Sequence, residues 1–340
     1  MKIGITYDLK SDAPLAAHLP DDYQEEFDSP VTIEAIASVL RRLGHAVTRL
    51  GDGREMLEAV LRDPPDFVFN FAEGQGVSRS REARVPAVLE MLGIPYTGSD
   101  PLTLAVTLDK DCARRLVESA GVRVPRAEVW YPGDDLLDLQ SHPWLPYSPV
   151  IVKPAWEGSS KGIRGQCVVD TPQELNAAIE SLRKDYRQPI LVEEYIQGEE
   201  LTVGLLGNGD PTSLGVLRVL PVRATERFVY SLEVKRDFRR LVRYESPAQL
   251  PAAHTAAVER AARAAFRILG CRDVARADFR LRDGVPYFLE VNPLPGLNPE
   301  SSDLVILATM NGWTYDALIA GILQAARDRH AATSPPSAPA

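Results

Sequence analysis

ARADFRLRDGVPYFLEVNPLPG, residues 275–296, is the most informative segment of the sequence. Two runs of strand-forming residues flank the turn Arg-Asp-Gly at 282–284, which predicts a β-hairpin. If Gly284 lies at its centre, Asp278 on the first strand faces Glu290 on the second, because each is six residues from the glycine. Like charges that face each other destabilise a sheet, so this pairing needs a compensating partner.

A divalent cation on this face of the hairpin would supply the compensation. Asn292 lies two residues beyond Glu290, so the period of two along a strand puts both side chains on one face. Three oxygen ligands suit Mg²⁺ or Mn²⁺ better than Zn²⁺, and Mg²⁺ held by few side chains usually shares its shell with substrate phosphates. The alternative is a solvated face on which Arg276 and Arg280 neutralise the acids.

Toward the amino terminus, IVKPAWEGSSKG, residues 151–162, has the composition of a phosphate-binding loop. A predicted strand ends at Lys153 and opens into residues 158–162, whose backbone amides, hydroxyls and lysine can bind an anion. It is not a P-loop, because the spacing GxxxxGK[ST] occurs nowhere in the chain. An ordinary Gly/Ser turn is the alternative.

Between these two segments, LVEEYIQGEELTV, residues 191–203, combines an apolar strand end with four glutamates. Glutamates can hold ribose hydroxyls or an exocyclic amine, and the backbone between them can bind the edge of an adenine. A solvated sheet edge is the alternative for this segment.

The composition of the 340 residues limits the class of protein. At roughly 150 residues per domain, the chain suggests about two or three domains. A net charge of −9 argues against nucleic acid as a partner, and no apolar run reaches the roughly 18 residues of a membrane span. The amino end lacks a secretory signal, and Cys112, Cys167 and Cys271 form no CxxC pair, so we expect a cytoplasmic protein without disulfides or a thiolate zinc site.

The first 99 residues alternate between strand and helix patterns, which predicts a parallel sheet covered by helices. Ligands bind at the carboxyl ends of the strands in such sheets, and Glu73 lies at one of these ends. We expect strands at 2–7, 45–50 and 67–71 and helices at 29–43, 54–62 and 84–92.

The remaining residues predict two α+β lobes. We expect a central lobe with a helix at 104–120, strands at 150–153, 161–169 and 190–195, and a helix at 172–182. The C-terminal lobe is expected to have strands at 201–206 and 213–220, a polar connection at 225–245, a helix at 251–269, the hairpin and a helix ending near Arg329. The predicted domains are therefore 1–99, 100–198 and 199–331, followed by a disordered tail at 332–340.

Taken in order, Lys110, Lys153, EEYIQGEELTV and the pair RADF…LEVNPLPG resemble the ATP-grasp superfamily, and most closely its D-alanine:D-alanine ligase branch. The resemblance runs from Phe67 to the closing helix. It implies an α/β, ATP-grasp fold, in which an N-terminal parallel-sheet (pre-ATP-grasp) domain precedes two α+β lobes that sandwich ATP.

The resemblance also implies an activity. The family transfers the γ-phosphate of ATP to a carboxylate and joins the resulting acyl phosphate to an amine, which yields an amide, ADP and phosphate. ATP would be the co-substrate, with two Mg²⁺ (or Mn²⁺) ions held by Asp278, Glu290 and Asn292. The partners implied are a small-molecule carboxylate and amine, either amino acids or a peptide, and a second copy of the chain in a homodimer.

Further roles follow from the resemblance alone. Arg276 would stabilise the tetrahedral intermediate, Ser159 and Lys235 are the other catalytic residues implied, and Ser301 and the Gly296 amide would contact the substrates. The ATP-binding residues implied are Lys110, Lys153, Glu157, Ser159, Ser160, Glu193, Glu194, Ile196 and Glu200.

The chain departs from the ligase pattern at substrate contacts. It has no counterpart of an early glutamate that binds the first substrate's ammonium, and residues 70–74, which include Glu73, replace a histidine-glycine signature. Arg236 replaces a loop tyrosine, beside Lys235 in a basic run that predicts an active-site lid or a solvated face. A ligase for L-amino acids or for a natural-product intermediate, and a regulatory module that binds nucleotide without turnover, therefore remain alternatives.

Overall fold

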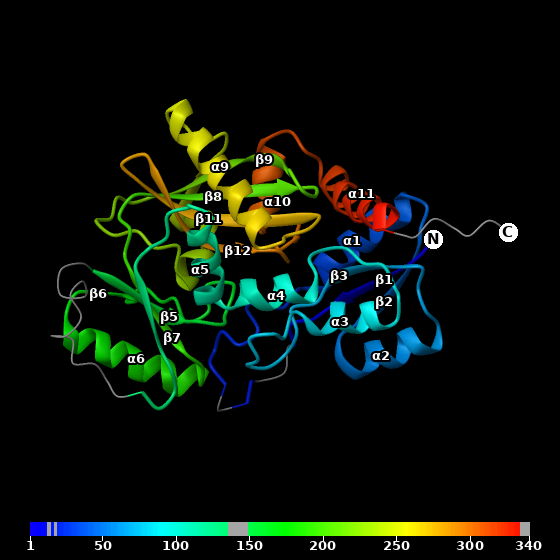
Figure 1. The fold of residues 1–340 in the computed structure, drawn as a ribbon, viewed down its shortest axis with the longest axis horizontal. Coiled ribbons are helices and arrows are strands. Elements are labelled where there is room, and N and C mark those ends of the chain that lie inside the picture. Colours follow the sequence, from blue (N-terminus) through cyan, green and yellow to red (C-terminus); the bar gives the residue numbers. More distant parts are fainter. Residues whose placement is uncertain (12–14, 17–18, 135–148, 334–340) are drawn as a thin grey trace.

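The computed structural model describes residues 1–11, 15–16, 19–134 and 149–333. This part of the chain forms three sheets, which follow one another along the sequence (Figure 1). The first sheet is parallel and the other two are antiparallel, which agrees with the predicted α/β domain and two α+β lobes. Among the described residues, no helix is both long and apolar enough to cross a membrane.

The parallel sheet confirms the strand and helix pattern predicted for the amino-terminal residues. Its order is β2-β1-β3, and every residue of β3 is buried, as the continuous apolar run requires. The first helix starts where the Ser29 hydroxyl accepts a hydrogen bond from the Thr32 amide. The elements are β1 (Lys2–Tyr7), α1 (Pro30–Arg42), β2 (Ala46–Gly51), α2 (Gly53–Arg62), β3 (Phe67–Phe71) and α3 (Arg84–Met91).

The hydrophobic core of this sheet continues into the C-terminal helices α10 (Asp303–Met310) and α11 (Tyr315–Thr333). Ile3 and Ile33 belong to the same buried cluster as Ile319 of α11. The last helix extends past its predicted end near Arg329, so the predicted tail starts within its final turn and lies outside the described residues from 334 on. The domain limits at 99 and 198 stay predictions.

The central sheet is antiparallel, with the order β4-β7-β5-β6. A Thr171–Glu174 capping box starts its helix α6, which buries Leu175 and Ile179 against the strands. The elements are β4 (Ala127–Trp130), β5 (Val150–Pro154), β6 (Val168–Val169), α6 (Pro172–Tyr186) and β7 (Ile190–Glu194).

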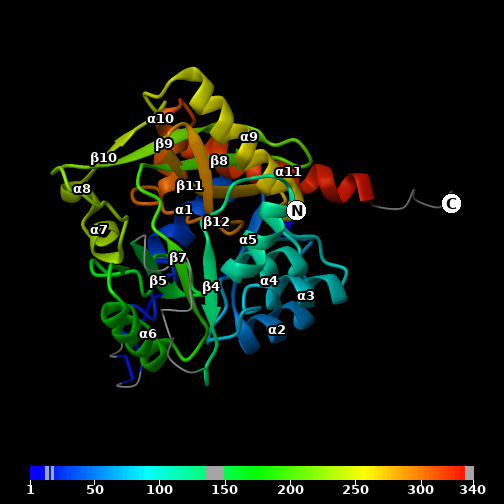
Figure 2. The ribbon, with the colours of Figure 1, turned by 60° about the vertical axis from the view of Figure 1, so that its left-hand side comes forward.

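The C-terminal sheet is covered on both faces, in the order β10-β9-β8-β11-β12 (Figure 2). Leu201 and Val203 pack in the cluster that contains α9, whereas Gly204 faces α10 so closely that an added Cβ would lie 2.8 Å from Leu304 Cδ1. The elements are β8 (Glu199–Leu206), β9 (Thr212–Pro221), β10 (Val242–Glu245), α9 (Ala252–Ile268), β11 (Val274–Arg282) and β12 (Val285–Asn292).

Three predicted elements were wrong in detail. The single helix at 104–120 is two helices, α4 (Pro101–Leu108) and α5 (Lys110–Ser119), because Asp109 is extended and its side chain caps the second helix. The strand at 161–169 is only β6, since the backbone before it turns. The polar connection at 225–245 contains α7 (Leu232–Arg236), α8 (Phe238–Leu241) and β10.

The hairpin has the predicted pairing but a different turn. Asp278 faces Glu290 and Arg276 faces Asn292, whereas Arg282 pairs with Val285, so the turn contains two residues. Asp283 and Gly284 both have positive φ, as a two-residue hairpin turn of type I′ needs. A bulge opposite the step from Asp278 to Phe279 then restores the pairing of the two acids.

Candidate active site

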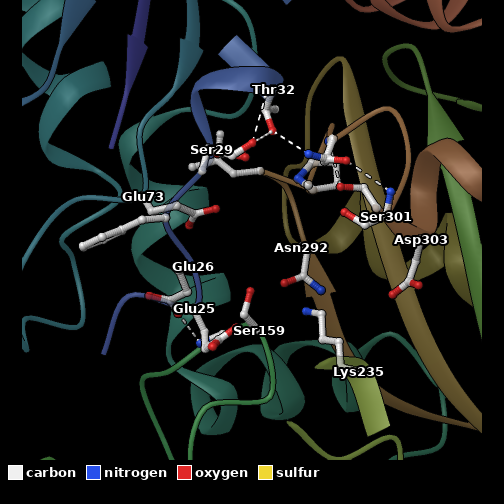
Figure 3. Close-up of a pocket in the computed structure, with 18 of the residues that line it drawn as sticks. Glu25, Glu26, Ser29, Thr32, Glu73, Ser159, Lys235, Asn292, Ser301 and Asp303 are labelled. Atoms are coloured by element: carbon white, nitrogen blue, oxygen red, sulfur yellow. Dashed lines mark hydrogen bonds between the residues drawn. The ribbon is translucent and has the colours of Figure 1, made fainter. Parts of the chain in front are cut away.

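A cavity of about 460 Å³ lies where the parallel sheet meets the two lobes (Figure 3). Acidic residues of the amino-terminal domain line one side, and basic residues of the C-terminal lobe line the other. The predicted site residues that line it are Glu73, Ser159, Lys235, Arg236, Arg276, Asn292, Gly296 and Ser301.

The acidic face of the hairpin is half-buried and ion-paired rather than solvated. Arg276 donates to Asp278 at 2.7 Å, and Lys110 lies 3.0 Å from Glu290, whose side chain is 22% exposed. Burial opposes ionisation of Glu290, but the charges of Lys110, Lys153 and Arg276 prevail and lower its pKa to about 2. Burial raises the pKa of Asp278, although Arg276 opposes the rise. The neutralising role suggested for Arg276 is therefore confirmed at a half-buried site, whereas Arg280 pairs with Glu200 instead of these acids.

The oxygen atoms on this face fit a hard divalent cation. Asp278 and Glu290 are cross-strand neighbours, and the Asn292 amide lies 3.4 Å from the Asp278 carboxylate. Over the described ranges, no group of three His, Cys, Asp or Glu side chains suits a metal ion, so a site here needs the asparagine oxygen as a ligand. Two carboxylates and an amide are the donors that Mg²⁺ accepts when phosphates complete its shell.

Two lysines lie close enough to the acidic face for their charges to act on Glu290. Lys110 is the first residue of α5 and also donates to the Glu157 carbonyl. Lys153 on β5 contacts Glu193 on the neighbouring β7 at 2.5 Å, and both side chains are buried. The solvated edge considered for Glu193 is therefore wrong.

The Gly/Ser loop holds an uncommon backbone conformation. Ser159 and Ser160 both have positive φ, at 50° and 60°, which costs energy for residues with a Cβ and is typical of functional loops. The Ser159 side chain faces the cavity, whereas Ser160 donates to the Tyr230 carbonyl. The Glu157 carboxylate points instead into a buried cluster with Arg81 and Lys161.

The residues predicted to bind the nucleoside lie at the end of β7 and the start of β8. Glu200 accepts a hydrogen bond from Arg280 at 2.8 Å, and burial raises its pKa. Ile196 is buried. Glu194 pairs with Arg282 at 2.9 Å, and since side chains alternate along a strand, it lies on the opposite face from Glu193.

Part of the basic run lines the cavity. Lys235 on α7 lines the cavity, and its pKa is lowered by burial and by the charge of Arg276. Arg236 also lines it and donates to Glu25 at 2.6 Å. Arg239 and Arg240 on α8 are exposed, which agrees with the alternative prediction of a solvated face for this part of the run.

The predicted substrate contacts lie at opposite sides of the cavity. Figure 3 shows Glu73 at one side and Ser301 at the other. Burial, together with the charges of Glu82, Glu26 and Asp28, raises the pKa of Glu73 well above its usual value. The Ser301 amide donates to the Asn298 side chain, while its hydroxyl is exposed.

The sequence interpretation missed the segment before α1, residues 19–29, which we call the strap. Glu26 accepts hydrogen bonds from Arg81 and from the Gly158 amide of the Gly/Ser loop. Asp22 accepts from the Gly162 amide at 3.0 Å and from Tyr186 at 2.6 Å. The strap therefore holds the Gly/Ser loop through its backbone. The only sequence signal is the run DDYQEEFD, five acids in eight residues.

A second missed group supports Arg276. Asp303 at the start of α10 is buried and accepts from Tyr244 at 2.9 Å and from Tyr230 at 3.2 Å. Its other oxygen lies 3.9 Å from Arg276. The charges of Asp278 and Asp303 outweigh burial and raise the Arg276 pKa, so its guanidinium stays charged.

Comparison with known proteins places these features in one family. Residues 121–324 match the family model described as D-ala D-ala ligase C-terminus. A D-alanine–D-alanine ligase of Aquifex aeolicus is 33% identical over 299 residues, which cover 86% of this chain and 93% of that protein. An uncharacterised protein of Sinorhizobium fredii is 36% identical over 313 residues, which cover 87% of this chain and 88% of that one.

Solved structures share the fold. The crystal structure of D-alanine–D-alanine ligase from Bacillus anthracis complexed with ATP has a TM-score of 0.74 at 23% identity, and the match covers 98% of this chain and 100% of that one. This likeness confirms the ATP-grasp fold that the sequence resemblance implied. Together with the matched sequences, it shows that the chain belongs to the D-alanine–D-alanine ligase family and is an ATP-dependent, amide-bond-forming ligase.

Proposed function

We propose that this ligase joins the carboxylate of one amino acid to the amine of a second, with Mg²⁺ as the divalent metal of the site. Family members use ATP and a divalent metal, and their substrates are small amino acids. The observation that carries the proposal is the hairpin, where Asp278, Glu290 and Asn292 lie together between Lys110 and Arg276. This is an anionic metal site with cations at its edge, which suits the phosphates of ATP.

Different residues of the chain would bind the phosphates, the nucleoside and the metal ions. Lys110, Lys153 and the Ser159 loop would contact the phosphates, and the end of β7 with Glu200 would hold the nucleoside. Asp278, Glu290 and Asn292 would hold two Mg²⁺ ions, which neutralise phosphate charge when bound. The Lys153–Glu193 contact and the strap keep these groups in place before ATP arrives.

Two chemical steps follow from this placement. An oxygen of the substrate carboxylate attacks the γ-phosphorus as its bond to the β,γ-bridging oxygen breaks, giving an acyl phosphate and ADP. The amine nitrogen of the second substrate then attacks the acyl carbon, the carbon–oxygen bond to phosphate breaks, and a proton leaves the nitrogen. Arg276 and the Gly296 amide would stabilise the oxyanion of this step, and the observation that both residues line the cavity supports this role.

Glu73 is the residue that we propose binds the ammonium of the first substrate. Its carboxyl faces the cavity in Figure 3, and none of the described residues makes an ion pair with it. The neighbouring Glu26 is already neutralised by Arg81 and Lys161. A substrate ammonium would give Glu73 a direct ion-pair partner.

The test is ADP release from Mg-ATP with pooled D-amino acids and then pooled L-amino acids, with mass spectrometry of the products. Wild type is expected to release ADP with one pool and to yield a dipeptide. Glu73→Gln is expected to raise the KM of the carboxylate amino acid at least tenfold and to leave the KM of ATP unchanged. Glu55→Gln, on an exposed face of α2, is the control. An unchanged amino-acid KM would reject the role of Glu73, and silence with both pools would reject amino acids as substrates.

A further inference from the structure

A second cavity, which we call the annex, opens beside the first. Its volume is about 430 Å³, within the range of sites that bind small molecules. The two cavities share part of their lining, so a ligand can extend from one into the other. The shared residues are Ser29, Arg236, Phe238, Asn298 and Ser301.

The annex reaches the side of the active site opposite Glu73 through Ser301. Figure 3 shows Ser301 across the first cavity from Glu73, whereas Ser29, which also lines both cavities, lies nearer Glu73. Glu73 is the proposed position of the first substrate's ammonium, so the amine substrate occupies the Ser301 side. A group that this second substrate carries beyond its reacting end can therefore extend past Ser301 into the annex.

The annex has a mostly polar lining that includes two large apolar side chains, Val31 and Phe238. Val31 on α1 is 61% exposed, although it is a large apolar side chain at the wall of a cavity. Phe238 is half-buried, and the Arg239 guanidinium lies 5.6 Å from its ring centre. Arg239 also pairs with Glu300 at 3.3 Å, which leaves no excess charge at this part of the rim.

We propose that the amine substrate is larger than alanine and that its extension binds in the annex against Val31 and Phe238. This inference rests on the proposed function and specifies the acceptor. An amino acid with a long aliphatic side chain and a short peptide share this chemistry, since both add several carbon atoms beyond the α-amine. Apolar contact of this kind is worth tenfold or more in kcat/KM for each buried methylene.

The experiment compares acceptors at a fixed carboxylate substrate, the one that supports ADP release. Alanine, leucine and the dipeptide alanyl-alanine, each in both stereochemical forms, are supplied as amines, and tandem mass spectrometry assigns which residue supplied the nitrogen. We expect leucine or the dipeptide to exceed alanine at least tenfold in kcat/KM. A preference for leucine would indicate that the extension is an amino-acid side chain, whereas a preference for the dipeptide would indicate that it is a peptide.

Two matched variants locate the effect. Val31→Trp fills the annex and is expected to lower kcat/KM for the larger acceptor at least tenfold while alanine is used as before. Leu61→Trp changes an equally exposed residue, at 62%, on α2 and should alter neither. ADP release with alanine but with no larger amine, or an equal loss for both acceptors in Val31→Trp, would overturn the inference and leave the proposed function standing. No ADP release with any pair would instead reject the proposed function.

Discussion

Replacing Glu26 with Gln tests whether the contacts between the strap and the Gly/Ser loop stabilise the folded protein. The Glu26 side chain is 3% exposed and that of Arg81 1%, with an N–O distance of 2.8 Å. Breaking one partner of a buried pair costs about 3–5 kcal/mol, and Arg81 keeps a contact with Glu157 at 3.3 Å, so the lower end applies. The pKa of Glu26 indicates a stabilisation of the same size. Burial opposes ionisation, but Arg81 and Lys161 lower the Glu26 pKa from 4.5 to about 2, and this shift corresponds to about 3 kcal/mol of stability.

The assay is denaturant unfolding at pH 7, with Glu34→Gln as the matched control. Glu34 also pairs with an arginine, Arg41, at 2.7 Å, but its side chain is 48% exposed, so its loss should destabilise the protein far less than the loss of Glu26. Because the folded pKa of Glu26 is depressed, its contribution is complete above pH 4.5 and disappears as the pH falls toward 2. Equal destabilisation by Glu26→Gln and Glu34→Gln at pH 7 would mean that the buried pair of the strap stabilises the protein no more than an exposed surface pair.

Two further predictions concern stability. Burial raises the pKa of Asp28 from 3.8 to about 7, against the effects of Thr32 and Lys10, so the wild type loses stability as the pH rises to 7. The stability of Asp28→Asn relative to wild type should therefore increase by about 3 kcal/mol between pH 5 and 8. Thermal unfolding that depends on pH in the same way for both proteins would contradict this. Phe279→Ala removes a fully buried ring whose centre lies 5.8 Å from that of Phe288. Denaturant unfolding should show that the free energy of unfolding falls by about 3–5 kcal/mol. A decrease of less than about 1 kcal/mol would mean that the hairpin is not part of the core.

The sequence predicted the acidic hairpin because its information is local. Two strand patterns and a turn lie within 22 residues, and the pairing of Asp278 with Glu290 follows from counting. The count assumed a turn centred on Gly284, whereas the structure combines a two-residue turn with a bulge. The shorter turn and the bulge shift the register in opposite directions, so Asp278 still pairs with Glu290. A bulge leaves no mark in the alternation of this short strand, so the sequence could not reveal it.

Local caps explain where the helix prediction failed. The apolar pattern at 104–120 continues through Asp109, so periodicity alone predicts one helix. Asp109 instead adopts an extended backbone and caps α5 by accepting from the Cys112 amide. This break places Lys110 at the start of α5, where it reaches Glu290. The conformation of a single residue therefore sets the position of a predicted site lysine.

The strap could not be predicted because its contacts are distant in sequence. Glu26 lies 55 residues from Arg81 and 132 from Gly158 along the chain. A family resemblance did not help either, because the strap lies where the chain departs from the ligase pattern. Its dense acidic composition was visible, but an acidic run is more often a solvated surface. Only the fold shows that two of its acids bind the amides of the Gly/Ser loop.

The role of the hairpin as the metal site is tested by comparing ADP release by wild type and Glu290→Gln with Mg-ATP and the amino acid pools. Glu290 is the acid that faces Asp278 and contacts Lys110, so the substitution removes a proposed metal ligand and leaves the side-chain size unchanged. We expect amino-acid-dependent ADP release by wild type and a loss of about a hundredfold or more in the variant. Undiminished release by Glu290→Gln would contradict the assignment of the hairpin as the metal site that drives amide formation.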